Sequence, residues 1–215
     1  MTSAIVFDLD GTLVDSAPDL HAAANRMLAE FGQAPLSLEK VTSFIGNGIP
    51  NLVRLARLES GLPEAEEERM KALMLANYTA HPADLTRPYP GVVEALVALR
   101  QAGYRLGVCT NKFRAPSVQI LDALNLSQYF DVVIGGDSLA AKKPDPAPLH
   151  AAFTALKAPA LLYVGDSEVD AETAERAQIA FALYTRGYRK TPVAELTTTF
   201  TFDAYAQLVA QIKSL

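Results

Sequence analysis

The stretch Ala4-Ile5-Val6-Phe7-Asp8-Leu9-Asp10-Gly11-Thr12 decides the fold of this chain. Its first four residues are apolar and rich in β-branched and aromatic side chains, which is typical of a short buried strand. If the chain stays extended from Asp8 to Asp10, both carboxylates project to the same side, because strand side chains alternate with a period of two. Gly11 then allows a sharp turn. Like charges at this spacing need a cation or a shared proton, unless the acids are simply solvated at a strand-to-turn junction.

The overall composition is that of a soluble globular protein. The chain has 215 residues, of which 50% are hydrophobic and 20% charged, and this is enough for one core carrying a smaller insert. A net charge of −5 gives no reason to expect nucleic acid or a membrane surface as a partner. The absence of a long apolar run and of a signal peptide, together with a single cysteine, predicts a cytoplasmic protein without an intrachain disulfide.

The order of helical and strand patterns predicts two structural units. Apolar residues recur at helical spacing from residue 17 to 31 and over 38–45, 49–59 and 64–78, with no convincing strand among them. After Pro88 the patterns alternate, with strands expected at 104–109, 132–134, 161–164 and 180–184 and helices between and after them. We therefore expect an α/β fold, a Rossmann-like parallel sheet with helices on both faces, formed by residues 1–15 and 82–215. Residues 16–81 would be an inserted all-helical domain.

Polar residues follow several of the expected strands. Because ligands bind beyond the carboxyl ends of parallel strands, residues at these positions are expected to meet at one edge of the sheet. They are Asp8 and Asp10 after the first strand, Thr110 and Asn111 after the second, Lys143 in a loop before a proline, and Asp166 with Asp170 four residues later.

These residue types together favour phosphoryl transfer. The three carboxylates of Asp8, Asp10 and Asp166 are hard oxygen ligands of the kind that Mg²⁺ prefers. A hydroxyl, an amide and an ammonium, from Thr110, Asn111 and Lys143, are donors suited to phosphoryl oxygens. Plainer readings are that the Thr–Asn and Asp–Ser pairs cap helices and that the lysine belongs to a solvated pair with its neighbour.

Four motifs give the sequence a family resemblance. They are Phe7-Asp8-Leu9-Asp10-Gly11-Thr12-Leu13, Thr110-Asn111-Lys112, Lys143-Pro144 and Gly165-Asp166-Ser167 with Asp170 beyond. In this order they resemble the motifs of the haloacid dehalogenase superfamily, and the helical insert is similar to its four-helix C1-type cap. Residues 13–20, 44–48, 89–91, 133–137 and 142–146 further resemble the bacterial phosphoglycolate phosphatases within it.

The resemblance implies a role for each site residue. Asp8 would be the nucleophile that forms an aspartyl-phosphate, and Asp10 the general acid and base. Asp8, the backbone carbonyl of Asp10, and Asp166 would hold Mg²⁺, while Asp170 would orient Lys143 or a water molecule. The cap loop Gly46-Asn47-Gly48 would contact the leaving group.

The expected substrate is a small phosphorylated metabolite, with 2-phosphoglycolate the first choice, and the expected oligomeric state is a monomer or weak homodimer. A β-phosphoglucomutase-like phosphotransferase and a broad-specificity sugar phosphatase share the core motifs and stay open. A haloacid dehalogenase would need neither the second aspartate nor the metal site. A non-enzymatic receiver-like module is a single domain of roughly 120 residues, which leaves no place for the helical insert.

Overall fold

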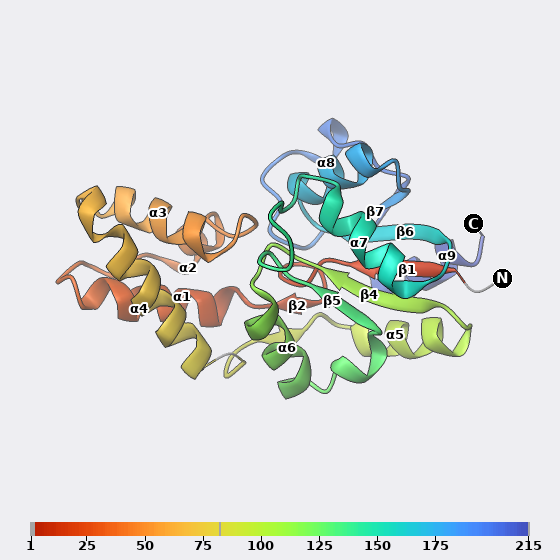
Figure 1. The fold of residues 1–215 in the computed structure, drawn as a ribbon, viewed down its shortest axis with the longest axis horizontal. Coiled ribbons are helices and arrows are strands. Elements are labelled where there is room, and N and C mark those ends of the chain that lie inside the picture. The colour runs from red at the N-terminus through yellow and green to blue at the C-terminus, as the bar shows by residue number, and fades with distance from the viewer. Residues whose placement is uncertain (1–2, 82, 215) are drawn as a thin grey trace.

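The computed structural model describes residues 3–81 and 83–214, and its centre is a six-stranded parallel sheet (Figure 1). The strands lie in the order β5-β4-β1-β6-β7-β8, which places the first strand of the chain between β4 and β6. Their bounds are β1 Ala4–Phe7, β4 Arg105–Cys109, β5 Val132–Ile134, β6 Ala160–Gly165, β7 Phe181–Tyr184 and β8 Phe200–Phe202.

Helices cover both faces of this sheet. The side chains of β1 point alternately to the two faces and pack into a buried cluster on each. Ile5 and Phe7 pack in one cluster, and Ala4 and Val6 pack in the other. Helices α5 (Val92–Gln101), α6 (Arg114–Ala123) and α9 (Tyr205–Ile212) contribute to the first cluster, and α7 (Ala147–Leu156) and α8 (Glu168–Ala177) to the second. The predicted α/β fold is therefore confirmed.

Four further helices form a separate group beside the sheet (Figure 1). They are α1 (Ala17–Ala29), α2 (Leu38–Thr42), α3 (Ile49–Glu59) and α4 (Glu67–Ala80), and we call residues 17–80 the helical unit. Helix α1 packs against α2 and α4, and α3 packs against α4. The division into a core over 1–15 and 82–215 and a cap over 16–81 stays a prediction, and residue 82 lies outside the described residues.

Both ends of the helical unit pass through one small connection. Strand β2 (Val14–Asp15) pairs antiparallel with β3 (Arg87–Pro88). Next to this pair, the buried carboxylate of Asp19 accepts hydrogen bonds from the backbone N–H groups of Leu85 and Thr86 and from the Thr86 hydroxyl, at 2.6–3.1 Å. The first turn of α1 is thus tied to the segment that follows α4.

The sequence patterns miss three short strands. Strands β2 and β3 have two residues each and β8 has three, too few to show an alternating pattern. Strand β5 is as short as β8, but its three residues form an apolar run that the sequence does show. The helix expected over 38–45 is also shorter, because α2 ends at Thr42. Along the described chain, none of the helices combines the length and apolar character needed to cross a bilayer.

The substitution Asp19→Ala is expected to lower the free energy of unfolding by about 2–3 kcal/mol, because it leaves buried donors without an acceptor. The measurement is urea unfolding at equilibrium. Glu39→Ala is the matched control, since Glu39 occupies the first turn of α2 but is exposed. It should change the free energy by less than about 0.5 kcal/mol. Equal effects of the two substitutions would contradict this role of Asp19.

Candidate active site

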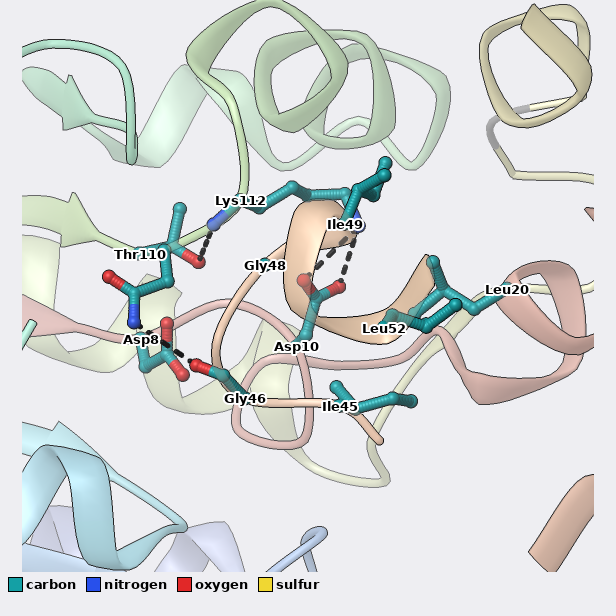
Figure 2. A pocket seen from close by; sticks show the side chains of 11 residues that line it. Asp8, Asp10, Leu20, Ile45, Gly46, Gly48, Ile49, Leu52, Thr110 and Lys112 are labelled. Carbon is teal, nitrogen blue, oxygen red and sulfur yellow. Dashed lines mark hydrogen bonds and ion pairs between the residues drawn. The ribbon is translucent and has the colours of Figure 1, made fainter. Parts of the chain in front are cut away.

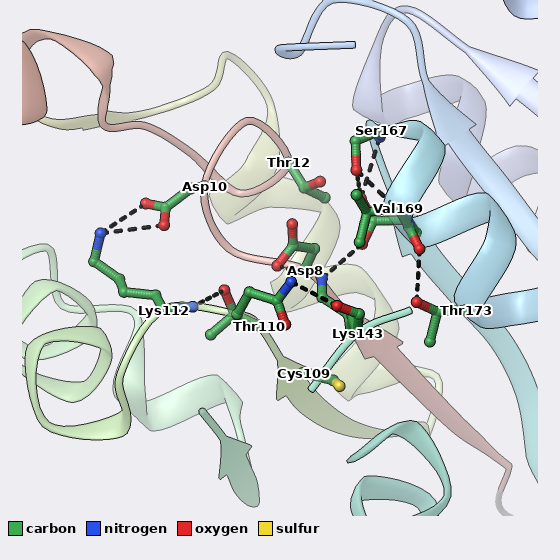
Figure 3. Close-up of polar contacts among 12 residues, drawn as sticks. Asp8, Asp10, Thr12, Cys109, Thr110, Lys112, Lys143, Ser167, Val169 and Thr173 are labelled. Atoms are coloured by element: carbon green, nitrogen blue, oxygen red, sulfur yellow. Dashed lines mark hydrogen bonds and ion pairs between the residues drawn. The ribbon is translucent and has the colours of Figure 1, made fainter. Parts of the chain in front are cut away.

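Three buried carboxylates meet at the carboxyl ends of β1 and β6. Figure 3 shows one of them, Asp8, among its polar neighbours. Asp8 follows β1 directly, Asp166 follows β6, and Asp170 lies in the first turn of α8. One carboxylate oxygen of each lies within 4.8 Å of the others. The parallel topology therefore brings Asp8 and Asp166 together, as predicted from strands far apart in the sequence.

Glycines and backbone groups make this close approach possible. A Cβ atom at Gly11 would lie 2.5 Å from a carboxylate oxygen of Asp166, and one at Gly187 would lie 2.3 Å from it. The Thr12 hydroxyl donates to Asp166 Oδ1 at 2.7 Å, and the backbone N–H of Tyr188 donates to Oδ2 at 2.6 Å. The Asp166 side chain is thus held from both sides.

Lys143 joins two of the three carboxylates. Its ammonium nitrogen lies 2.6 Å from Asp170 Oδ1 and 3.0 Å from Asp8 Oδ1, and it also donates to the Tyr163 hydroxyl at 2.8 Å. Asp170 Oδ2 accepts from the backbone and side chain of Ser167, which caps α8. Every oxygen of Asp170 is therefore engaged by protein donors.

The cluster holds more negative than positive charge. Burial raises the pKa of Asp8 and outweighs the opposing attraction of Lys143. Burial, followed by repulsion from Asp170 and Asp8, holds the pKa of Asp166 well above its usual value. Burial also opposes ionisation of Asp170, but the Lys143 ammonium and its hydrogen bonds bring the pKa of Asp170 below the usual range. A cation near Asp8 and Asp166 would favour their charged forms.

Asp10 does not share these partners, and the condition that the chain stays extended from Asp8 to Asp10 is not met. The chain bends at Leu9, and the Asp10 side chain is absent from the carboxylate cluster. Both of its oxygens lie 3.1 Å from the Lys112 ammonium, and Oδ1 also accepts from the Ser16 hydroxyl at 2.5 Å. Each of the two aspartates therefore has its own lysine, in place of one shared cation.

Thr110 and Asn111 lie beside Asp8, after β4. The Thr110 oxygen accepts from the backbone N–H of Lys112 at 3.2 Å, which leaves its own hydrogen free to donate. The Asn111 amide donates to the carbonyl oxygens of Gly46 at 3.1 Å and Lys143 at 3.0 Å. Donation from this amide to a phosphoryl group, as predicted, would require it to leave these carbonyls.

The loop before α3 reaches this edge of the sheet. Besides the contact between Gly46 and Asn111, a Cβ atom at Gly48 would lie 2.9 Å from the Asn111 carbonyl oxygen. Gly46 and Gly48 have φ angles of +117° and +81°, a region that favours glycine. The predicted loop 46–48 thus lies against the site, and its contact with a leaving group stays a prediction.

A small cavity of about 30 Å³ connects the aspartates to the helical unit (Figure 2). Its polar wall comes from the ends of β1 and β4, and its apolar wall from α1, α3 and the loop before α3. The lining residues are Asp8, Asp10, Thr110, Asn111, Lys112, Leu20, Ile45, Gly46, Gly48, Ile49 and Leu52. A second cavity, of about 10 Å³, joins both aspartates to Asp166, Asn47 and Tyr188.

Three side chains that shape the site are not among the predicted site residues. They are Thr12, Lys112 and Tyr188, whose hydroxyl donates to Asp15 and accepts from the backbone of Ala17. Thr12 and Lys112 stand inside the motifs that identify the family, so their position gave a signal. Tyr188 follows β7 without any local pattern.

Comparison with known proteins agrees with this geometry. The family model for haloacid dehalogenase-like hydrolases matches residues 5–184. A phosphoglycolate phosphatase of Cereibacter sphaeroides is 50% identical over 213 residues, which cover 98% of each chain. One from Rhodobacter capsulatus is 40% identical and covers 97% of this chain and 95% of its own.

A solved structure is also similar over the whole chain. The crystal structure of a predicted phosphoglycolate phosphatase from Haemophilus somnus has a TM-score of 0.92 and 33% identity, covering 98% of this chain and 97% of that one. The fold, the carboxylate cluster and these relatives agree. This chain therefore belongs to the haloacid dehalogenase-like hydrolases, and it is a phosphatase of that family.

Proposed function

We propose that the protein is a Mg²⁺-dependent phosphomonoester hydrolase that works through an aspartyl-phosphate on Asp8, with 2-phosphoglycolate as its substrate. The observation that carries this proposal is the group of three buried carboxylates, Asp8, Asp166 and Asp170, within 4.8 Å of one another beside Lys143. Asp10 lines the same cavity as Asp8, where a leaving group would lie.

The donor set fits Mg²⁺. The oxygens are hard ligands. Burial, and after it repulsion between the carboxylates, raises the pKa values of Asp8 and Asp166, so a bound cation would favour their charged forms. Asp170 already pairs with the Lys143 ammonium at 2.6 Å, whereas both donors to Asp166 are neutral groups. Asp8, Asp166 and the Asp10 carbonyl are therefore the proposed ligands. Bound Mg²⁺ would supply positive charge that lets an anionic nucleophile approach an anionic ester.

The reaction would take place in two chemical steps, in which Asp8 and Asp10 have different roles. In the first, a carboxylate oxygen of Asp8 bonds to phosphorus, the ester bond breaks, and the leaving oxygen takes a proton from Asp10. In the second, Asp10 takes a proton from water as the water oxygen attacks the same phosphorus. The bond from phosphorus to Asp8 then breaks, which releases phosphate and restores the Asp8 carboxylate.

The surrounding donors would position the phosphoryl group. Lys143 contacts Asp8 directly, and its ammonium would attract phosphoryl oxygens while holding the nucleophile. The free Thr110 hydrogen can donate to the same group. Asp170 contacts Lys143 and is fully buried, so a substrate does not reach it. Its proposed role is therefore to orient that lysine.

The size of the cavity favours a small leaving group. A cavity of about 30 Å³ holds roughly two water molecules, so it suits a two-carbon leaving group better than a sugar. The similar chains from Cereibacter and Rhodobacter bear the name phosphoglycolate phosphatase. We further propose that the helical unit is a cap, and that its loop 46–48 contacts the leaving group.

Asp8→Asn is expected to lower kcat/KM towards 2-phosphoglycolate by at least about 10³-fold, because the amide cannot act as the nucleophile. Phosphate release in the presence of Mg²⁺ is the measurement. Asp203→Asn is the control, since Asp203 is an exposed aspartate that pairs with Arg186. Its activity should equal that of the wild type. Wild-type turnover by Asp8→Asn would rule out the proposed nucleophile.

Mg²⁺ in large excess over its Kd should raise the melting temperature by about 5–10 °C, because it binds only the folded site. Differential scanning fluorimetry with MgCl₂ or EDTA measures this shift. Asp166→Asn should lose most of it, and Glu175→Gln, an exposed acid on α8, should keep it. A full shift in Asp166→Asn would show that the ion binds elsewhere.

A panel of phosphomonoesters tests the substrate. We expect kcat/KM for 2-phosphoglycolate to exceed that for hexose phosphates at least about 10-fold, since the cavity suits a small leaving group better than a sugar. Higher values for sugar phosphates would favour the broad-specificity alternative. In single-turnover experiments the phosphoenzyme should release free phosphate, and transfer to a sugar phosphate would instead identify a mutase.

A further inference from the structure

Lys112 is a buried cation that the proposed chemistry does not use. Only 5% of its surface is exposed, and its ammonium nitrogen lies 3.1 Å from both oxygens of Asp10 and 4.4 Å from the centre of the Tyr78 ring. Burial opposes the charge, but Asp10 and Tyr78 together outweigh this effect and raise the pKa of Lys112. Lysine is rarely buried to this extent without a specific reason.

Lys112 is also the one cationic residue in the wall of the larger cavity, among the described residues that line it (Figure 2). The wall opposite the aspartates is apolar, with Leu20, Ile45, Ile49 and Leu52. The other charged residues among the described lining are the acids Asp8 and Asp10, so Lys112 is the group in this wall that can attract an anionic part of a ligand.

Two neighbouring features favour an anion beside Lys112, one in the cavity wall and one, Tyr78, that contacts Lys112 from outside the lining. Helix α3 begins at the cavity wall with Gly48 as its N-cap, which has no side chain to bind the first N–H groups. The Tyr78 hydroxyl, at the ring that covers Lys112, is buried and has no hydrogen-bond partner among the residues that the structure describes. It is a donor, since burial raises its pKa to about 12.

The proposed proton transfer gives Lys112 a specific need for such an anion. When Asp10 carries the proton for the leaving group it is neutral, and Lys112 then loses its counter-ion. A carboxylate on the leaving group would restore the pairing. In an ester of a 2-hydroxy acid, that carboxylate is attached to the carbon that bears the ester oxygen, so it lies next to the atom that Asp10 protonates.

We propose that Lys112 is a specificity-determining residue that binds the carboxylate of the leaving group, so that the site selects phosphomonoesters of short 2-hydroxy acids. This assignment rests on the proposed function and names the feature of the substrate that the site recognises. It also explains why the acid–base residue and the specificity residue are in direct contact.

The test compares three esters in the wild type, Lys112→Gln and Lys112→Arg. They are 2-phosphoglycolate, 2-hydroxyethyl phosphate, which replaces the carboxylate by a neutral CH₂OH group, and p-nitrophenyl phosphate, whose leaving group needs no proton. We expect the ratio of kcat/KM for the first two esters to fall by about 30-fold or more in Lys112→Gln, and by less in Lys112→Arg. Lys142→Gln, which removes an exposed charge nearby, should leave the ratio unchanged.

The outcomes separate this assignment from the proposed function. If the wild type hydrolyses all three esters but the ratio survives in Lys112→Gln, Lys112 acts only through Asp10 and the assignment is overturned. If the wild type hydrolyses none of them with Mg²⁺, the proposed function falls and this assignment falls with it.

A binding measurement on the wild type keeps the test independent of how the variants fold. The inhibitor 3-phosphonopropionate is an isostere of 2-phosphoglycolate, and propylphosphonate lacks its carboxylate. We expect the first to inhibit at least about 10-fold more strongly. Equal inhibition by the two compounds would also overturn the assignment.

Discussion

The confinement of negative charge at the centre of the sheet edge is the constraint on which the rest of this structure depends. Asp8, Asp166 and Asp170 lie close together and buried, with Lys143 paired to two of them. Such a cluster is stable only when every oxygen has a donor or a cation. The Thr12 hydroxyl, the Tyr188 backbone and the Ser167 cap supply donors for Asp166 and Asp170. The Asp8 oxygen that faces Lys143 makes no hydrogen bond among the described residues, and the ammonium 3.0 Å away is the cation that compensates it.

The site separates its two aspartates by giving each a different lysine. Asp8 contacts Lys143, which comes from the loop before α7, whereas Asp10 contacts Lys112, which follows β4. The bend at Leu9 is what allows this division. Under the proposed function, it places a nucleophile in a strongly charged environment and an acid–base group at the edge of a mostly apolar cavity.

The sequence predicts those parts of the site that follow from strand order and motifs, but not those that depend on tertiary packing. The meeting of Asp8, Asp166 and Lys143 was predictable, because parallel strands end at one edge and the motifs mark those ends. The pairing of Lys112 with Asp10 was not, since it depends on the bend at Leu9 and on how α4 places Tyr78 over the lysine. The contacts of the Asn111 amide and the short strands β2, β3 and β8 likewise arise from tertiary packing, which leaves no periodic pattern.

The antiparallel pair β2–β3 makes the helical unit easy to replace during evolution. Because the helical unit leaves and rejoins the sheet through strands that lie side by side, its 64-residue length spans almost no distance in the core. The chain-closure entropy of an insertion grows only slowly with its length. Exchange of these helices for another set would therefore leave the sheet and its carboxylates unstrained, and descendants of one catalytic scaffold could acquire new selectivity by replacing a single module.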